Sequence, residues 1–228
     1  MLKKYNPSAE DFESLYVKEN PWGCDGGVQD LIRIKIINNY FKNCKFNKGI
    51  DIACGEGYCT SRLSFIKNKS GIDISSLAIK RAIKNYGEIN FIVGNPFKDV
   101  LTNSKYDFVS CFEALYYPTS TSDREQAIRN LLELGNKETI FAFSVVTIGR
   151  NEHRDYYTKE SFKKLISKYY KIVDIIPVTL KSDKLIFRII QKLISYLSKS
   201  LAAKLFYKRT LTSLDKNVYQ HLFILKRN

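Results

Sequence analysis

Two aspartates on either side of a glycine turn are the residues of this sequence best suited to do chemistry. Asp51 lies in an apolar run at 49–53, and Gly55 and Gly57 follow it. Asp73 ends a second apolar run, 22 residues after Asp51. Glycines let backbone N–H groups approach a ligand, and a carboxylate at a strand end accepts hydrogen bonds from ribose hydroxyls. The spacing of the two aspartates fits a β-α-β unit. The pattern predicts a nucleoside site, although a plain tight turn would have the same glycines.

The first motif distinguishes between two kinds of nucleoside ligand. A dinucleotide site has the pattern G-x-G-x-x-G, but Thr60 stands where the third glycine would be. That pattern also has no acid inside the first strand. The order of an acid, a small residue and two glycines instead resembles the first motif of class I S-adenosylmethionine (SAM)-dependent methyltransferases. In this sequence the four residues are Asp51, Ala53, Gly55 and Gly57, with Ala53 in place of the family's usual first glycine.

This resemblance implies that SAM is the cofactor, and it assigns the cofactor a set of contacts. The glycine turn would pass the methionine part of SAM, and Asp73 would bind the ribose. Asn95 stands where the family contacts adenine, and its amide can form a hydrogen bond to the ring edge. The residues expected to bind the cofactor are Tyr16, Trp22, Asp51, Ala53, Gly55, Gly57, Asp73, Ile74, Asn95, Pro96 and Phe112.

Three short runs of residues make the resemblance more specific. The runs FESLY (12–16), PWG (21–23) and EALYY (113–117), in this order around the glycine turn, resemble the nodulation protein S type of small-molecule methyltransferase. The resemblance covers about residues 10–165, and enzymes of that type methylate the amine of a chitooligosaccharide. It implies that the N-terminal segment closes over the cofactor. Trp22 would contact the cofactor there, or would anchor the segment to the core.

Methyl transfer to an amine or a hydroxyl needs a group that removes a proton from the acceptor. Glu113 is one candidate, because it follows a central strand at the edge where open α/β sheets bind ligands. His153 is the other catalytic candidate, because histidine titrates near neutral pH, although an ordinary loop histidine would look the same. The residues expected to bind the substrate are Tyr116, Tyr117, Arg154 and Tyr157.

Alternating strand and helix patterns predict the elements that position these residues. Strands are expected at 48–53, 70–74, 90–93, 106–112, 139–146, 171–176 and 218–225. Helices are expected at 28–41, 59–66, 76–86, 122–134 and 159–168. Such alternation predicts an α/β fold whose mostly parallel sheet is covered by helices on both faces. The resemblance adds a Rossmann-like sheet of seven strands that ends in an antiparallel pair.

The chain is expected to form a single SAM-dependent methyltransferase domain. Residues 1–45 would be an N-terminal cap segment, 46–178 the cofactor-binding core, 179–217 a basic amphipathic helical insertion before the last strand, and 218–228 that strand. Apolar and basic residues recur at helical spacing within 184–209. This segment could pack on its own domain, form a homodimer, or lie on a membrane surface.

Composition bears on partners and location. The net charge is +14, and residues 181–228 hold eleven Lys or Arg against two Asp. Such a basic end could meet nucleic acid, an anionic membrane or an acidic substrate, or could simply be a lysine-rich surface. Five cysteines without a C-x-x-C pair, with two histidines, predict no metal site and a cytoplasmic location, with peripheral membrane contact as an option. No signal peptide or membrane-spanning segment is expected.

The leading hypothesis is transfer of a methyl group from SAM to an amine or hydroxyl of a small molecule, expected to be a sugar or glycan precursor. An RNA methyltransferase is the alternative that the charge supports, although no added RNA-binding module is recognisable. A non-catalytic SAM-fold partner subunit is the third possibility. The intact acids and glycines of the nucleoside motif argue against it.

Overall fold

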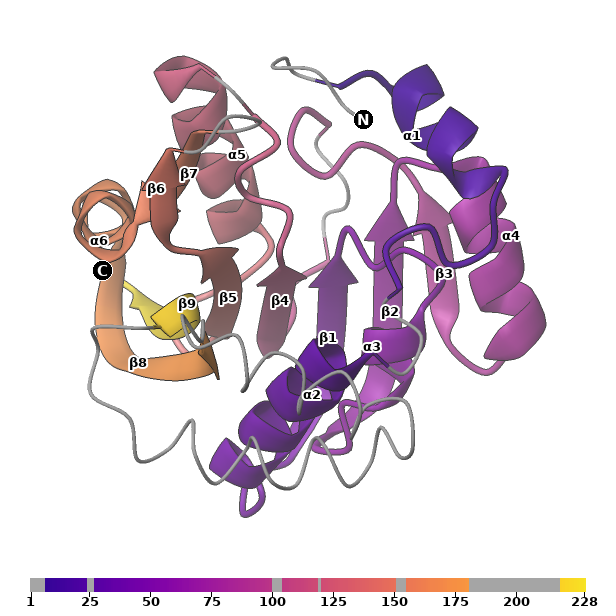
Figure 1. Ribbon diagram of the computed structural model, residues 1–228. Coiled ribbons are helices and arrows are strands. Elements are labelled where there is room, and N and C mark those ends of the chain that lie inside the picture. The colour runs from indigo at the N-terminus through magenta and orange to yellow at the C-terminus, as the bar shows by residue number, and fades with distance from the viewer. Residues whose placement is uncertain (1–6, 24–26, 100–103, 119, 151–154, 181–217) are drawn as a thin grey trace, which may run out of the picture.

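The computed structural model describes residues 7–23, 27–99, 104–118, 120–150, 155–180 and 218–228, and its centre is a seven-stranded sheet (Figure 1). Its strands are β1 (Phe46–Ile52), β2 (Ile66–Asp73), β3 (Asn90–Val93), β4 (Phe108–Phe112), β5 (Ile140–Val146), β8 (Tyr170–Leu180) and β9 (Val218–Arg227). The order is β3-β2-β1-β4-β5-β9-β8, parallel from β3 to β5, with β9 antiparallel to both neighbours. The predicted fold class, strand number and antiparallel final pair are confirmed.

Helices lie on both faces of this sheet, as Figure 1 shows. They are α1 (Ala9–Tyr16), α2 (Val28–Tyr40), α3 (Tyr58–Ser61), α4 (Ser76–Asn85), α5 (Thr121–Glu133) and α6 (Lys159–Ile166). Successive strand residues face opposite sides of a sheet. In β5, Phe141 and Phe143 therefore pack with α5 residues such as Leu131, whereas Ala142 packs with α2 residues such as Ile36.

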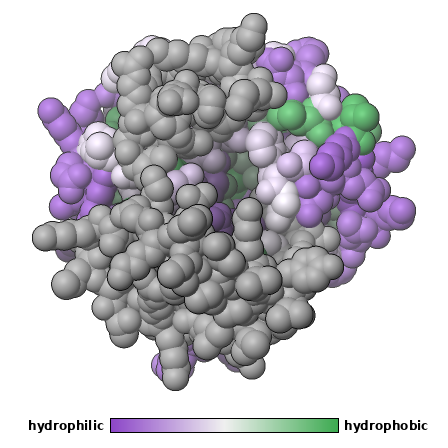
Figure 2. Space-filling model, in the orientation of Figure 1, coloured by the Kyte–Doolittle hydropathy of each residue, from purple (hydrophilic) through white to green (hydrophobic). Residues whose placement is uncertain are grey.

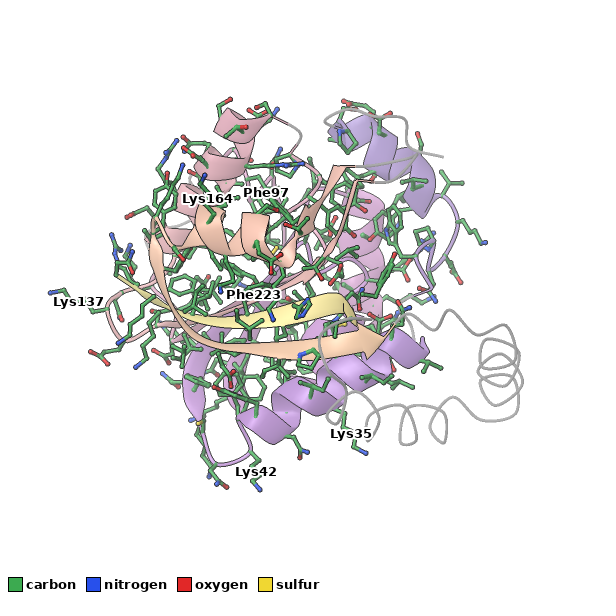
Figure 3. All side chains as sticks on the ribbon, turned by 60° about the vertical axis from the view of Figure 1, so that its left-hand side comes forward. Lys35, Lys42, Phe97, Lys137, Lys164 and Phe223 are labelled. Carbon is green, nitrogen blue, oxygen red and sulfur yellow. The ribbon has the colours of Figure 1, made fainter. Side chains whose placement is uncertain are left out.

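The last strand continues this alternation and completes both cores. Phe223 belongs to the same cluster as Phe143, and its neighbour Leu222 belongs to the cluster on the other face. In Figure 3, Phe223 lies in the interior, whereas Lys42 and Lys137 project outward from the ribbon. The C-terminal strand is therefore an integral part of the sheet, whereas these lysines lie on the surface of the molecule.

Several local features differ from the sequence prediction, and α1 is one of them, because no helix was expected before residue 28. The helix expected at 59–66 is only the short α3, and β2 begins at Ile66 instead of residue 70. Leu63 and Phe65 end the helix because they turn into the aromatic core beneath α2. In addition, a small hairpin of β6 (Ile148–Arg150) and β7 (Asp155–Thr158) forms where a loop was expected.

Several predictions concern residues outside the described ranges. They include the roles of His153 and Arg154 and almost all of the expected insertion at 179–217. The three alternatives for the segment 184–209, which are packing on its own domain, a homodimer and a membrane surface, therefore stay predictions. Among the described helices, none is long and apolar enough to cross a membrane.

One glutamate attaches the N-terminal segment to the edge of the sheet where the parallel strands end. Glu13 of α1 accepts hydrogen bonds from the hydroxyls of Ser75 and Ser76 and from the Leu77 backbone N–H, 3.2 Å away. These groups form the start of α4, where the helix dipole also favours a carboxylate. The contact holds α1 beside the ends of β1 and β2 (Figure 1).

Removing the Glu13 carboxylate tests this attachment. In Glu13→Ala we expect amide hydrogen exchange in α1 to become about tenfold faster while the strands keep their protection, because roughly 1–2 kcal/mol of local interaction is lost. Hydrogen exchange followed by mass spectrometry measures both regions. Glu19→Ala, an equal charge change at an exposed position of the same segment, is the control. Unchanged exchange in α1 of the Glu13 variant would contradict the attachment.

Candidate functional site

The turn after β1 is built from three residues with left-handed backbones. Their φ angles are +56° at Ala53, +54° at Gly55 and +80° at Gly57. A Cβ atom at Gly55 would lie 2.8 Å from the Tyr16 hydroxyl oxygen, and one at Gly57 would lie 2.6 Å from the Phe91 ring. Gly55 is therefore required by the close approach of α1, and Gly57 by packing of the turn against β3.

Asp73, at the end of β2, connects this turn to the start of α4. Its Oδ2 accepts a hydrogen bond from the Gly55 N–H (2.8 Å), and its Oδ1 accepts one from the Ser75 N–H (3.0 Å). Burial raises the pKa of Asp73 to about 6, although these two hydrogen bonds favour the charged form. The group is therefore ionised at neutral pH. Because a carboxylate has about four acceptor positions, Asp73 can still accept hydrogen bonds from ribose hydroxyls.

Asp51 holds the inner side of the turn. Its Oδ2 accepts a hydrogen bond from the Thr60 hydroxyl and its Oδ1 from the Ser110 hydroxyl, both at 2.7 Å. These partners lie in α3 and β4, so one buried carboxylate joins β1 to two other elements. Burial raises the pKa of Asp51 to about 6, opposed by the same two hydroxyls. Asp51 also lines the cavity described next, so it can both shape the turn and face a ligand.

A cavity of about 740 Å³ lies between the glycine turn and the N-terminal segment, and Figure 2 shows the hollow on this side of the molecule. Its volume lies in the upper part of the usual range of about 300–1,000 Å³ for small-molecule sites. The wall brings together most of the residues expected from the sequence. These are Tyr16, Trp22, Asp51, Ala53, Gly55, Asp73, Ile74, Asn95, Pro96, Phe112, Glu113, Tyr116 and Tyr117.

Two expected site residues are absent from this described wall. Gly57 instead packs behind the turn. Tyr157 is a core residue, because it is 4% exposed and its hydroxyl donates a hydrogen bond to the Leu115 carbonyl (3.0 Å). Burial raises the pKa of Tyr157 to about 12, which fits a structural hydroxyl. The expectation that Tyr157 binds substrate is corrected accordingly: the sequence placed it in a loop, whereas β7 directs it into the core.

The end of the cavity beyond β3 is shaped by a tight turn. The Asn95 side-chain oxygen accepts the Phe97 N–H (3.1 Å), and the Asn95 N–H donates to Oδ2 of Asp99 (2.9 Å). One lone pair of the Asn95 amide oxygen is used locally, and its NH₂ group can also contact adenine. That group can donate to a ring nitrogen.

Aromatic side chains form the opposite wall of the cavity. Phe12 and Tyr117 meet edge to face with ring centroids 5.0 Å apart, and Trp22 lies 6.3 Å from Tyr117. Tyr116 stands 5.0 Å from Tyr117 on the other side. Trp22 is 41% exposed, so it packs on Tyr117 while part of its ring remains accessible. The wall therefore offers apolar faces together with phenolic groups.

A buried charged group beside Glu113 was not foreseen from the sequence. Arg33 of α2 is 4% exposed and forms an ion pair with Asp30, and its Nη1 lies 3.7 Å from Oε1 of Glu113. Ser144 of β5, which is fully buried, donates a hydrogen bond to the same oxygen. The available signal was the i, i+3 spacing of Asp30 and Arg33 on one helix face. The apolar positions of that helix, from which it was predicted, carry no information about this pair.

The cavity wall has the opposite charge from the protein as a whole. Of the charged residues in the described wall, seven are acidic and two are basic, in a chain of net charge +14. The acidic residues are Asp30, Asp51, Glu56, Asp73, Asp99, Glu113 and Asp123, and the basic ones are Arg33 and Lys98. A concave surface with an excess of one charge raises the local concentration of ligands of the opposite charge. This cavity therefore favours cationic ligands.

More than half of the chain matches the sequence model of a known protein family. The sequence model of a family described as "Methyltransferase domain" matches residues 41–176. Those residues run from the end of α2 to β8, and they contain the glycine turn, Asp73 and Glu113. In contrast, no curated protein sequence matches the chain.

Solved structures share the fold at low sequence identity. NodS, an N-methyltransferase from Bradyrhizobium japonicum in complex with S-adenosyl-L-homocysteine, matches with TM-score 0.69 and 17% identity over 96% of this chain and 97% of its own. An S-adenosylmethionine-dependent methyltransferase from Clostridium acetobutylicum matches with TM-score 0.62 and 14% identity, over 95% of this chain and 98% of its own. A TehB-like methyltransferase from Corynebacterium glutamicum matches with TM-score 0.61 and 13% identity, over 96% of this chain and 98% of its own. At these identities the likeness shows the fold.

The left-handed backbone at Ala53 predicts that a β-branched side chain at this position destabilises the protein. Ala53→Val should lower the free energy of unfolding by at least about 1 kcal/mol, because a β-branched side chain is strained at positive φ. Ala53→Gly should be tolerated, since glycine adopts this conformation without strain. Thermal and denaturant unfolding of the two variants measure the difference. A valine variant as stable as the wild type would contradict the geometry of the turn.

Proposed function

Because the chain belongs to the methyltransferase domain family, we propose that it transfers a methyl group from SAM to an amine of a small molecule. The match to the family confirms the predicted enzyme class. The acceptor is the new part of the proposal, and one observation carries it. Oε2 of Glu113 is buried in the cavity wall and has no hydrogen-bond partner among the described residues.

The residues of the glycine turn fit the expected cofactor. Gly55 lines the cavity, Asp73 supplies a carboxylate for the ribose, and Asn95 supplies an amide for adenine. When bound, SAM supplies an electrophilic methyl group on a sulfonium, and the excess of acidic residues in the wall favours that positive charge. These residues would bind and orient the cofactor, and positioning provides much of the acceleration of such a transfer.

Glu113 fits the needs of an amine acceptor. An amine is protonated at neutral pH and must lose a proton before its lone pair can react. Burial raises the pKa of Glu113 above its ordinary value, whereas Arg33 and Ser144 favour the charged form. A carboxylate in the cavity wall can bind the ammonium group and accept its proton. Glu113 would thus be the base, and the nitrogen would keep the lone pair that methylation requires.

The aromatic wall supports a sugar or glycan precursor as the molecule that carries the amine. Aromatic rings such as those of Tyr117 and Trp22 pack well against the apolar faces of sugar rings and also attract cations. An amino sugar combines both properties. The similar structure of NodS is that of an N-methyltransferase by name, which agrees with an amine acceptor.

The charge of the wall also weighs against the other candidate functions. The phosphates of RNA would be repelled by the seven acidic residues that surround the cavity. A hydroxyl acceptor needs a base but gains nothing from this negative wall, so it is the second candidate for the acceptor group. A non-catalytic subunit would have no need of a buried carboxylate oxygen without a hydrogen-bond partner among the described residues.

Matched acceptors test the proposal. Transfer of a radioactive methyl group from SAM should occur with amino-sugar oligosaccharides and should not occur with their N-acetylated forms. Glu113→Gln should lower kcat by about 100-fold or more, because general bases contribute on this scale, while the affinity for S-adenosylhomocysteine stays unchanged. The control is Glu125→Gln, the same change in α5 outside the cavity wall. Equal rates with both kinds of oligosaccharide, or full activity of Glu113→Gln, would contradict the amine proposal.

A further inference from the structure

We propose that Arg33 and Ser144 are positioning residues for Glu113: together they hold one oxygen of its carboxylate and favour its charged form at the cavity wall. The proposal rests on the proposed function only for the chemical use of Glu113. The positioning itself follows from the contacts of three elements that meet at this carboxylate.

The backbone turns the Glu113 side chain toward β5. Glu113 directly follows β4, and its φ of +56° takes it out of the strand alternation. Its backbone N–H still donates to the Ser144 carbonyl (2.8 Å), so the residue remains paired with β5. The Ser144 hydroxyl then donates to Oε1 from the same residue. One strand residue therefore fixes both the backbone and the side chain of Glu113.

Arg33 contacts the same oxygen from the other direction. Its guanidinium lies 3.7 Å from Oε1 of Glu113, 5.3 Å from the centre of the Phe112 ring, and in an ion pair with Asp30. The Arg33 side chain is 5% exposed and the Glu113 side chain 16%. Both partners on Oε1 come from buried positions, whereas Oε2 has no hydrogen-bond partner in the part of the chain described. Side chains from α2 and β5 therefore converge on Oε1 of Glu113.

The charges around Glu113 explain why this arrangement matters. Burial raises the pKa of Glu113; Arg33, Ser144 and the backbone of Val146 lower it, and Asp30 raises it. Burial raises the pKa of the neighbouring Cys111 thiol well above its ordinary value, so this neighbour is uncharged at neutral pH. Tyr219 and Gln220 of β9 line the same cavity. Arg33 is thus the cation that offsets both burial and the second carboxylate.

A direct titration of Glu113 tests the proposal without knowledge of the acceptor. The side-chain carboxyl carbons of glutamate are labelled with ¹³C in the ligand-free protein, and Glu113→Gln assigns the signal. Arg33→Met should move the titration midpoint of Glu113 upward by about one to three pH units, the usual effect of an opposite charge at this distance. Ser144→Ala should move it upward by less. Arg33→Lys, which retains the charge, should bring the midpoint back toward the wild-type value.

Thr139→Val is the matched control. It removes an equally buried hydroxyl beside the opposite end of β5, where Thr139 donates to the Tyr106 carbonyl, and it should leave the Glu113 midpoint at its wild-type value. If Arg33→Met fails to fold, the midpoint of Ser144→Ala decides the matter on its own. Midpoints that remain at the wild-type value in Arg33→Met and Ser144→Ala would overturn the proposal. Shifted midpoints together with full activity of Glu113→Gln would instead overturn only the catalytic use of Glu113.

Discussion

The hydrogen bond from the Gly55 amide to the Asp73 carboxylate joins the ends of β1 and β2, and the rest of the site is arranged around that junction. It can form only because the chain takes a left-handed turn directly after β1. The same turn brings Gly55 close to Tyr16 and sets Asp51 against α3 and β4. Two buried carboxylates therefore hold the turn at the ends of these strands, where a nucleoside can bind. Such junctions at the carboxyl ends of parallel strands are where open α/β sheets bind ligands.

Charge divides the molecule into an acidic cavity and a basic remainder. The chain carries +14, yet the described cavity wall has seven acidic residues and two basic ones. The cavity would attract a sulfonium cofactor and an ammonium acceptor, while the outer surface would attract anions. Arg33 is the exception within the wall, because its charge stabilises the neighbouring carboxylates of Asp30 and Glu113. The net charge, considered alone, left nucleic acid, an anionic membrane, an acidic substrate and a plain lysine-rich surface open; the distribution of that charge supports a small cationic acceptor.

The sequence was sufficient for the features that depend on local patterns. The family, the sheet and the wall positions of Asp73, Asn95 and Glu113 follow from motifs within a few residues of each strand end. Features that depend on contacts between distant segments were missed. Arg33 and Ser144 reach Glu113 from elements 80 and 31 residues away in the chain, and no local pattern reports such a meeting. Tyr157 was misplaced for the same reason, because only the packing of β7 shows that its hydroxyl is used by Leu115.

The central claim is that the turn after β1 and the Asp73 carboxylate bind SAM. Calorimetric titration of the purified protein with S-adenosylhomocysteine, beside Asp73→Ala, tests it most directly. The account predicts binding on the order of micromolar affinity in the wild type and loss of that binding in the variant, with the fold retained by circular dichroism. Absence of binding to the wild type, or equal binding to both proteins, would contradict it.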